Sequence, residues 1–242
     1  MELKGRKAKQ RVAELLGAED FFAALEILRG YRPRQSVNFL FPFFYHAEER
    51  LRWRAIAAFG RVVADLAEEH MESARVIMRR LMWNLNDESG GIGWGSPEAM
   101  GEATAVHAGL AGEFSRILRS YVRPDENFLE HEMLQRGVLW GIGRLAQVRP
   151  AALSETDVFL LPFLKSPDAC HRGFAAWALG NLRSRVATPD LEPLTQDPAE
   201  IRFFNELELA TVAVSVLARV ALLKIEKNAP EPPAGEHIID ED

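Results

Sequence analysis

The sequence predicts an all-α fold made of stacked helix pairs, and three observations lead to that class. Apolar residues recur at spacings of three and four along most of the chain, as on one face of an amphipathic helix. No segment shows a convincing alternation of apolar and polar residues that would indicate a strand. A pattern of tryptophan and glycine also returns at intervals of roughly 40 residues, which is typical of a solenoid of repeated units.

Composition sets the limits of this interpretation. The chain has 242 residues, of which 48% are hydrophobic, and a formal net charge of −6. Most of that charge lies in the acidic tail, so the rest is nearly neutral and has no general attraction for nucleic acid. Cys170 is the only cysteine, which excludes CxxC metal and redox motifs. Without an apolar signal core or an uncharged membrane-length segment, we expect a cytoplasmic protein that does not enter a membrane.

The first helices are predicted to cap the stack. Residues 2–16 combine apolar positions with five basic ones, and we interpret the basic residues as a solvated helix face, with phosphate contact as the alternative. A second helix follows over residues 18–28. The aromatic segment 37–45 has the composition of a strand, but Pro42 argues against an interior strand.

The rest of the chain divides into helix pairs. Helical spacing covers residues 48–69, 73–85, 97–122, 127–148, 157–165, 170–183, 191–195 and 201–225. Ser96 before Pro97 is typical of an N-cap followed by proline at the first helical position. The tail over residues 228–242 is acidic and contains prolines, and we expect it to be disordered.

A shared pattern relates these pairs to one another. Its copies are Trp53 to Gly60, Trp94 to Gly101, Val138 to Gly143 and Ala175 to Gly180, with a weaker copy from Ala213 to Ala218. Small residues at these positions let neighbouring helix backbones approach closely. We therefore predict a single domain over residues 1–227. Its repeats lie near residues 35–67, 73–122, 127–148, 157–183 and 190–225.

The best-defined unit resembles a HEAT repeat, including the variant found in phycobilisome lyase subunits. It consists of Leu161-Pro-Phe-Leu-Lys-Ser-Pro-Asp168, then Arg172, then Ala175-Ala-Trp-Ala-Leu-Gly-Asn-Leu182. The resemblance is good over 157–183 and weaker elsewhere. It implies an α-α superhelix, a HEAT-like solenoid of about five helical pairs with an N-terminal helical cap.

The resemblance also implies roles for individual residues. The aspartate of the turn and the arginine early in the second helix support neighbouring repeats in such proteins. The residues at the supporting positions here are Asp168, Arg172, Trp177 and Gly180. In the fifth unit the register stays open, because a second alignment runs through Asp197 and Arg202.

The helical pattern stops over residues 84–102, and this loop is the candidate binding surface. Its part from residue 84 to residue 98 contains four glycines, and Lys and Arg are absent from Leu81 through Ser115. The local field therefore favours a cationic or peptidic partner over phosphate, and the loop lacks the ending of a P-loop. The candidate partner-binding residues are Asn84, Asn86, Asp87, Glu88, Trp94, Glu98 and Glu102.

Other chemistry is not predicted. Glu98 and Glu102 share a helix face, but His107 lies roughly 140° further round at ~100° per residue, so they do not form a Glu-x-x-His metal pair. We interpret the acids as residues favoured at a helix start, and expect no metal and no cofactor. Most tryptophans are interpreted as core, whereas Trp94 among its glycines is equally compatible with exposure. No nucleophile–base spacing indicates catalysis.

The function predicted is a non-catalytic protein–protein interaction scaffold, which holds a cationic or peptide partner on a concave face with the 84–102 loop contributing. Two alternatives stay open. Some DNA glycosylases for alkylated bases resemble HEAT solenoids and use tryptophans with a carboxylate, although the acidic middle of this chain makes nucleic acid unfavourable. The repeat variant alone suggests a tetrapyrrole lyase or chaperone-like subunit. The apolar last helix is either buried in the fifth repeat or forms a homodimer contact.

Overall fold

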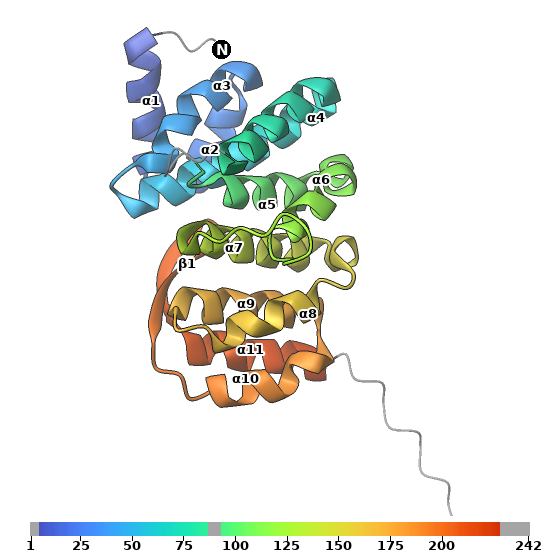
Figure 1. Cartoon of the computed structure of the whole chain (residues 1–242). Helices are drawn as coiled ribbons and strands as arrows, with labels where there is room; N and C mark the ends of the chain where they lie inside the picture. Colours follow the sequence, from blue (N-terminus) through green and yellow to red (C-terminus); the bar gives the residue numbers. More distant parts are fainter. Residues whose placement is uncertain (1–4, 87–92, 228–242) are drawn as a thin grey trace, which may run out of the picture.

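The computed structural model describes residues 5–86 and 93–227, and its helices stack along a single column (Figure 1). Successive helix pairs build an all-α superhelix, which confirms the predicted fold class. The acidic tail that we expect to be disordered lies outside the described residues. Among the residues that are described, no helix is long and apolar enough to cross a membrane.

Two helices cap the N-terminal end of the column. They are α1 (Gly5–Gly17) and α2 (Phe21–Arg29). The Asp20 side chain accepts a hydrogen bond from the backbone N–H of Ala23 and so caps α2. The Arg54 guanidinium donates to the carbonyl of Leu16 at 3.0 Å, which ties the cap to the first repeat.

The second helices of the repeats form a continuous layer, which we call the central row. Its members are the first part of α4 (Glu49–Asn86), then α5 (Ser96–Val106), α7 (Glu132–Val148), α9 (Ala169–Leu182) and α11 (Val214–Glu226). Each member contacts the next, and Figure 1 shows α5, α7, α9 and α11 lying one below another. The central row therefore carries contacts along the whole stack.

The first helices of the repeats are shorter and less regular. They are α3 (Pro33–Leu40) with the 3-10 helix Phe41–Tyr45, the second part of α4, α6 (Ala108–Ser120), α8 (Asp157–Leu160) between the 3-10 helices Pro150–Leu153 and Leu161–Lys165, and α10 (Thr188–Leu194) after the 3-10 helix Arg185–Ala187. Non-helical backbone angles at His70 kink α4, so one element supplies both the end of the first repeat and the start of the second.

Glycines let the central row pack at backbone distance. A Cβ added to Gly101 would lie 2.3 Å from Cα of Gly141, and one added to Gly180 would lie 2.5 Å from Cα of Ala221. At Gly60 the added atom would meet the neighbouring helix as well, because it would lie 2.9 Å from the backbone nitrogen of Ala103. This confirms the interpretation that the repeated small residues permit close helix approach.

The fifth repeat departs from the prediction. Residues 201–225 were expected to be one helix, but β1 (Glu200–Asn205) and β2 (Glu208–Ala213) form an antiparallel hairpin before α11 begins. The expectation that no strand occurs is therefore wrong here. Alternate burial of Ile201 and Phe203 places their side chains against the central row, and this packing outweighs the helical spacing of the segment.

A second correction concerns the segment 97–122, which is not one helix. The backbone of His107 is extended (φ −119°, ψ 121°), and its imidazole accepts a hydrogen bond from the N–H of Leu110. His107 thus ends α5 and caps α6, so the segment holds two helices, and α6 contacts both α5 and α7.

The hairpin runs along one edge of the column, from the level of α10 to the level of α7 (Figure 1). Phe204 stacks on Trp53 with ring centroids 5.4 Å apart, and Phe203 meets the edge of Trp177 at 4.9 Å. The indole Nε1 of Trp140 donates to the Phe204 carbonyl at 2.8 Å. The hairpin therefore bridges the first, third and fourth repeats.

Candidate binding pocket

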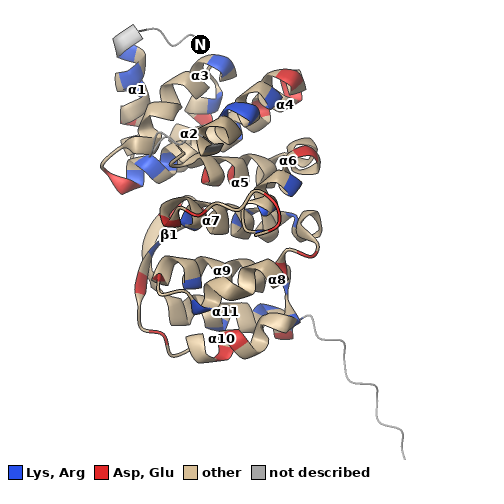
Figure 2. Cartoon of the chain, in the orientation of Figure 1, with Lys and Arg blue, Asp and Glu red and all other residues tan. Residues whose placement is uncertain are grey.

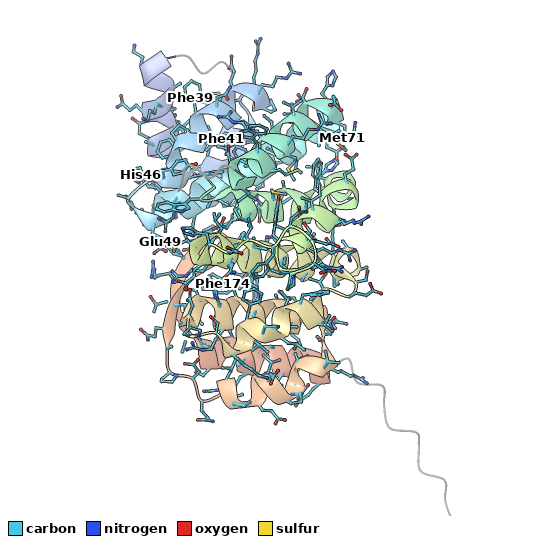
Figure 3. The ribbon with its side chains drawn as sticks, in the orientation of Figure 1. Phe39, Phe41, His46, Glu49, Met71 and Phe174 are labelled. Carbon is cyan, nitrogen blue, oxygen red and sulfur yellow. The ribbon has the colours of Figure 1, made fainter. Side chains whose placement is uncertain are left out.

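A pocket of about 360 Å³ opens where the first turns of α4, α5, α7 and α9 meet β1. The lining side chains that matter below are Trp53, Trp94, Glu98, Arg136, Phe174 and Arg202. Figure 3 labels Phe174 and one further lining residue, Glu49, on the side of the column that carries β1. The pocket is thus assembled from four repeats and the hairpin.

Glu98 is the unusual group in this pocket. It lies in the first turn of α5, and its Oε2 atom is shielded from solvent and has no hydrogen-bond partner among the described residues. Burial raises the pKa of this carboxyl to about 7, although its own backbone N–H and the nearby Arg52 act in the opposite direction. A shielded carboxyl without a partner is costly for folding, and it is poised to accept a donor from a ligand.

The missing side chain of Gly137 leaves the space that the Glu98 carboxyl fills. A Cβ added at Gly137 on α7 would lie 2.6 Å from the carboxyl carbon of Glu98. Any other residue at position 137 would therefore displace the carboxyl or separate α5 from α7. The shielding of Glu98 thus depends on a glycine far away in the sequence.

Aromatic rings flank Glu98. Trp53 is buried at 7% exposure and lines the inner wall, whereas Trp94 is 40% exposed and stands at the rim. Gly95 fixes the turn that holds Trp94, because its φ is +77° and an added Cβ would lie 2.8 Å from the Phe44 ring. Trp94 therefore offers ring surface to a ligand in the pocket, whereas the Trp53 ring already stacks on Phe204.

The arginines of the pocket already have carboxylate partners. Arg52 and Arg202 both pair with Glu49, at 3.4 and 3.0 Å between nitrogen and oxygen. Arg136 donates to Asp168 at 2.6 Å. Each of these cations therefore has a carboxylate within ion-pair distance, and Arg52 and Arg202 share that of Glu49.

The unpaired charges of the pocket are acidic. Glu98 and Glu200 line it, and neither has an ion pair among the residues that the structure describes. Acidic and basic residues are otherwise mixed along the column (Figure 2). The lining carries as many basic as acidic side chains, so the preference for a hydrogen-bond donor comes from the partnerless Glu98 oxygen and not from net charge.

The predicted binding residues separate in the structure. Trp94 and Glu98 line the pocket, whereas Asn84 is half-buried in the last turn of α4 and does not. Asn86 ends α4, and Asp87 and Glu88 lie outside the described residues. Two of the predicted residues therefore line the pocket.

Glu102 belongs to a different environment. It is 3% exposed, accepts a hydrogen bond from Nε of Arg144 at 2.6 Å and lies 3.6 Å from Nε of Arg61. It lines a second pocket of about 170 Å³ that also contains Trp140. Although Glu98 and Glu102 are one turn apart, the structure does not bring them together in one site.

The residues assigned to repeat support make contacts between repeats. Asp168 caps α9 through the N–H of Cys170 at 2.8 Å and also accepts from Arg136 of the preceding repeat. Arg172 donates to Asp197 at 2.7 Å, and so reaches the following repeat.

Trp177 and Gly180 mediate the close packing of α9. The Trp177 ring covers Gly143 of α7, where an added Cβ would lie 2.3 Å from it, and Gly180 faces α11 as described above.

Sequence reasoning missed several pocket residues. Arg136 and Gly137 carried no signal beyond ordinary helical spacing, and Glu200 lay in a segment assigned to a helix. Arg202 was noted only as part of an alternative repeat register. Within the described residues, no group of three or more His, Cys, Asp or Glu side chains is placed to hold a metal ion.

Comparisons with known proteins place the chain among repeat proteins. No family model matches it. An uncharacterized protein of Archaeoglobus fulgidus is 31% identical over 153 residues, which cover 61% of this chain and 75% of that protein.

Two solved structures share the fold. An engineered protein has a TM-score of 0.54 at 14% identity, covering 92% of this chain and 98% of the other. A designed armadillo repeat protein in complex with the peptide (KR)4 has a TM-score of 0.50 at 18% identity, covering 90% and 98%. At such low identity these likenesses concern the fold alone. They confirm an armadillo-like α-solenoid, which is the architecture predicted, and the phycobilisome-lyase variant stays a resemblance.

Proposed function

We propose that this chain, which belongs to the same family as the uncharacterized protein of Archaeoglobus fulgidus, is a non-catalytic binding scaffold that receives a basic side chain of a partner protein beside Glu98. The observation that carries the proposal is the shielded Glu98 oxygen, which has no partner among the described residues. An ammonium or guanidinium donates to it, and Trp94 at the pocket rim supplies the ring surface that such cations favour.

The fold supports a peptide partner. The designed armadillo repeat protein of similar fold was solved in complex with the peptide (KR)4, and we choose that peptide as the probe. The hairpin already covers Trp140 and Trp177 of the central row. We therefore propose that the partner binds at the pocket edge of the solenoid and not across the whole concave face. Trp94 and Glu98 are the residues of the 84–102 segment that line this pocket.

Peptide titration tests this proposal. Calorimetry with (KR)4 at pH 8 is expected to show binding that weakens by about 10- to 100-fold in Glu98→Gln, as for loss of a charge-assisted hydrogen bond. Glu192→Gln is the matched control, because it removes one negative charge from an exposed position on α10. Failure of the unmodified protein to bind, or equal weakening in both variants, would overturn the proposal.

A second candidate function has one observation in its favour. A carboxylate beside tryptophans in one pocket is the constellation implied by the resemblance to glycosylases for alkylated bases, and an alkylated base is itself cationic. That function requires DNA binding with a steep salt dependence and release of a methylated base from alkylated DNA. Base release that is abolished by Glu98→Gln would favour it over the scaffold.

A homodimer through α11 also stays a proposal. Leu217 and Ala221 are buried within the fifth repeat, but Val216, Val220 and Leu223 leave an apolar strip exposed. Light scattering across a concentration series, with Val220→Glu for comparison, distinguishes a dimer from a monomer. A monomeric mass for the unmodified protein at high concentration would exclude a homodimer through α11.

A further inference from the structure

The hairpin register determines which backbone groups of β1 face away from β2. Asn205 and Glu208 are paired across a two-residue turn, so they exchange hydrogen bonds and the pattern alternates from there. The N–H and carbonyl groups of Phe204 and Arg202 consequently point to the opposite edge of β1. The hydrogen bond from Trp140 to the Phe204 carbonyl shows the same direction independently.

This outer edge is closed at one end and open at the other. At one end the carbonyl of Phe204 accepts a hydrogen bond from the Trp140 indole. Two positions earlier in the strand, Arg202 lines the pocket. Neither the N–H nor the carbonyl of Arg202 has a hydrogen-bond partner among the described residues. An N–H and a carbonyl on one strand residue are the groups with which an added strand pairs.

We propose that an extended segment of the partner adds to β1 as a third strand at Arg202 and places a basic side chain in the pocket beside Glu98. The inference rests on the proposed function and adds the way in which the partner's main chain is recognised. One residue of the segment exchanges both of its backbone hydrogen bonds with Arg202. Its neighbours then run alongside the pocket at the usual strand separation of ~4.8 Å.

Charge and periodicity restrict the partner segment. Side chains of an extended strand alternate between faces, so every second residue points the same way. The pocket presents Glu98 and Glu200 as unpaired acceptors, while its arginines are engaged by Glu49 and Asp168. The segment that fits is therefore extended and carries basic residues at alternate positions, without proline at the residue that pairs with Arg202.

Proline substitutions at one cross-strand pair test the main-chain contact. Arg202 and Thr211 are directly opposite, and the N–H groups of both point away from the partner strand. Arg202→Pro removes the proposed donor, Arg202→Ala removes only the side chain, and Thr211→Pro removes an N–H from the edge remote from β1. We expect Arg202→Pro to bind (KR)4 about 3- to 10-fold more weakly than either other variant.

Hydrogen exchange on the unmodified protein gives a second measurement that does not depend on how the variants fold. Saturating (KR)4 is expected to slow exchange of the Arg202 amide and leave the Thr211 amide unchanged. A Glu98-dependent affinity that is equal in the Arg202→Pro and Arg202→Ala variants, with no slowing at Arg202, overturns strand addition and leaves the scaffold function standing. Absence of any binding by the unmodified protein overturns both.

Discussion

Replacing Glu98 by glutamine is expected to stabilise the folded protein above neutral pH. The ordinary pKa of this carboxyl is 4.5, and burial raises it to about 7 in the folded state. The folded protein therefore keeps the proton at pH values where the unfolded chain has lost it, so the free energy of unfolding falls as pH rises between these two values. Below the lower value the carboxyl is protonated in both states and has no effect on stability.

The size of the effect follows from the two pKa values. Each unit of difference corresponds to ~1.4 kcal/mol, so the rise from 4.5 to about 7 gives an expected loss of about 3 kcal/mol in the wild-type protein at pH 8. Glutamine has nearly the same shape, fits the space beside Gly137 and does not ionise. The Glu98→Gln variant should thus exceed the wild type in unfolding free energy by that amount at pH 8, and by much less at pH 5.

Urea denaturation followed by circular dichroism at both pH values measures the difference. Glu192→Gln serves as the reference for loss of one exposed negative charge. If the gain in Glu98→Gln is the same at pH 5 and pH 8, the shielding of the carboxyl is not what destabilises the wild type. Glu98 also links stability to function, because the substitution that stabilises the protein is expected to weaken peptide binding.

Three further outcomes are expected. Affinity for (KR)4 should rise between pH 6 and pH 8 and be flat in Glu98→Gln, because the cation binds the ionised carboxylate whose pKa is about 7; calorimetry measures it. Gly137→Ala should weaken peptide binding, because the methyl group occupies the carboxyl's space and displaces it, while urea titrations should show a change in stability of no more than about 1 kcal/mol, because the displaced atoms end a flexible side chain and alanine favours the helix. Glu206→Asn should raise stability by about 0.5–1 kcal/mol in the same assay, because φ is +51° at that turn position.

Local patterns were sufficient for the helix pairs and for the contacts between them. The recurrence of glycine at positions such as Gly101 and Gly180 predicted close helix approach, and the structure places both against backbone atoms of the next helix. The α9 unit carried the strongest resemblance, and its turn and cap residues are local in sequence. Signals of this kind need no knowledge of distant residues.

The misassigned segments depend on distant partners. Phe203 and Phe204 favour a strand because tryptophans from three other repeats meet them, and the segment's own spacing is compatible with a helix. The break at His107 depends on an imidazole acting as an N-cap, which is not among the preferred capping residues.

Glu98 was interpreted as a helix-start acid. Its place in the first turn of α5 agrees with that interpretation, but its shielding does not follow from local sequence. The shielding arises where α7 presents Gly137 to the carboxyl. Burial of this kind depends on a helix that follows α6 in the chain, so the sequence around Glu98 carries no signal of it.

The hairpin also bears on how the protein unfolds. In a simple solenoid each unit is stabilised by its immediate neighbours, so terminal units open first. Here Arg202 pairs with Glu49 and Phe204 stacks on Trp53, which joins the last repeat to the first across the intervening units. Opening either end breaks those contacts, so the chain should melt in one cooperative step. Its folding should be slower than that of a solenoid without such a hairpin, because these contacts close a loop of about 150 residues.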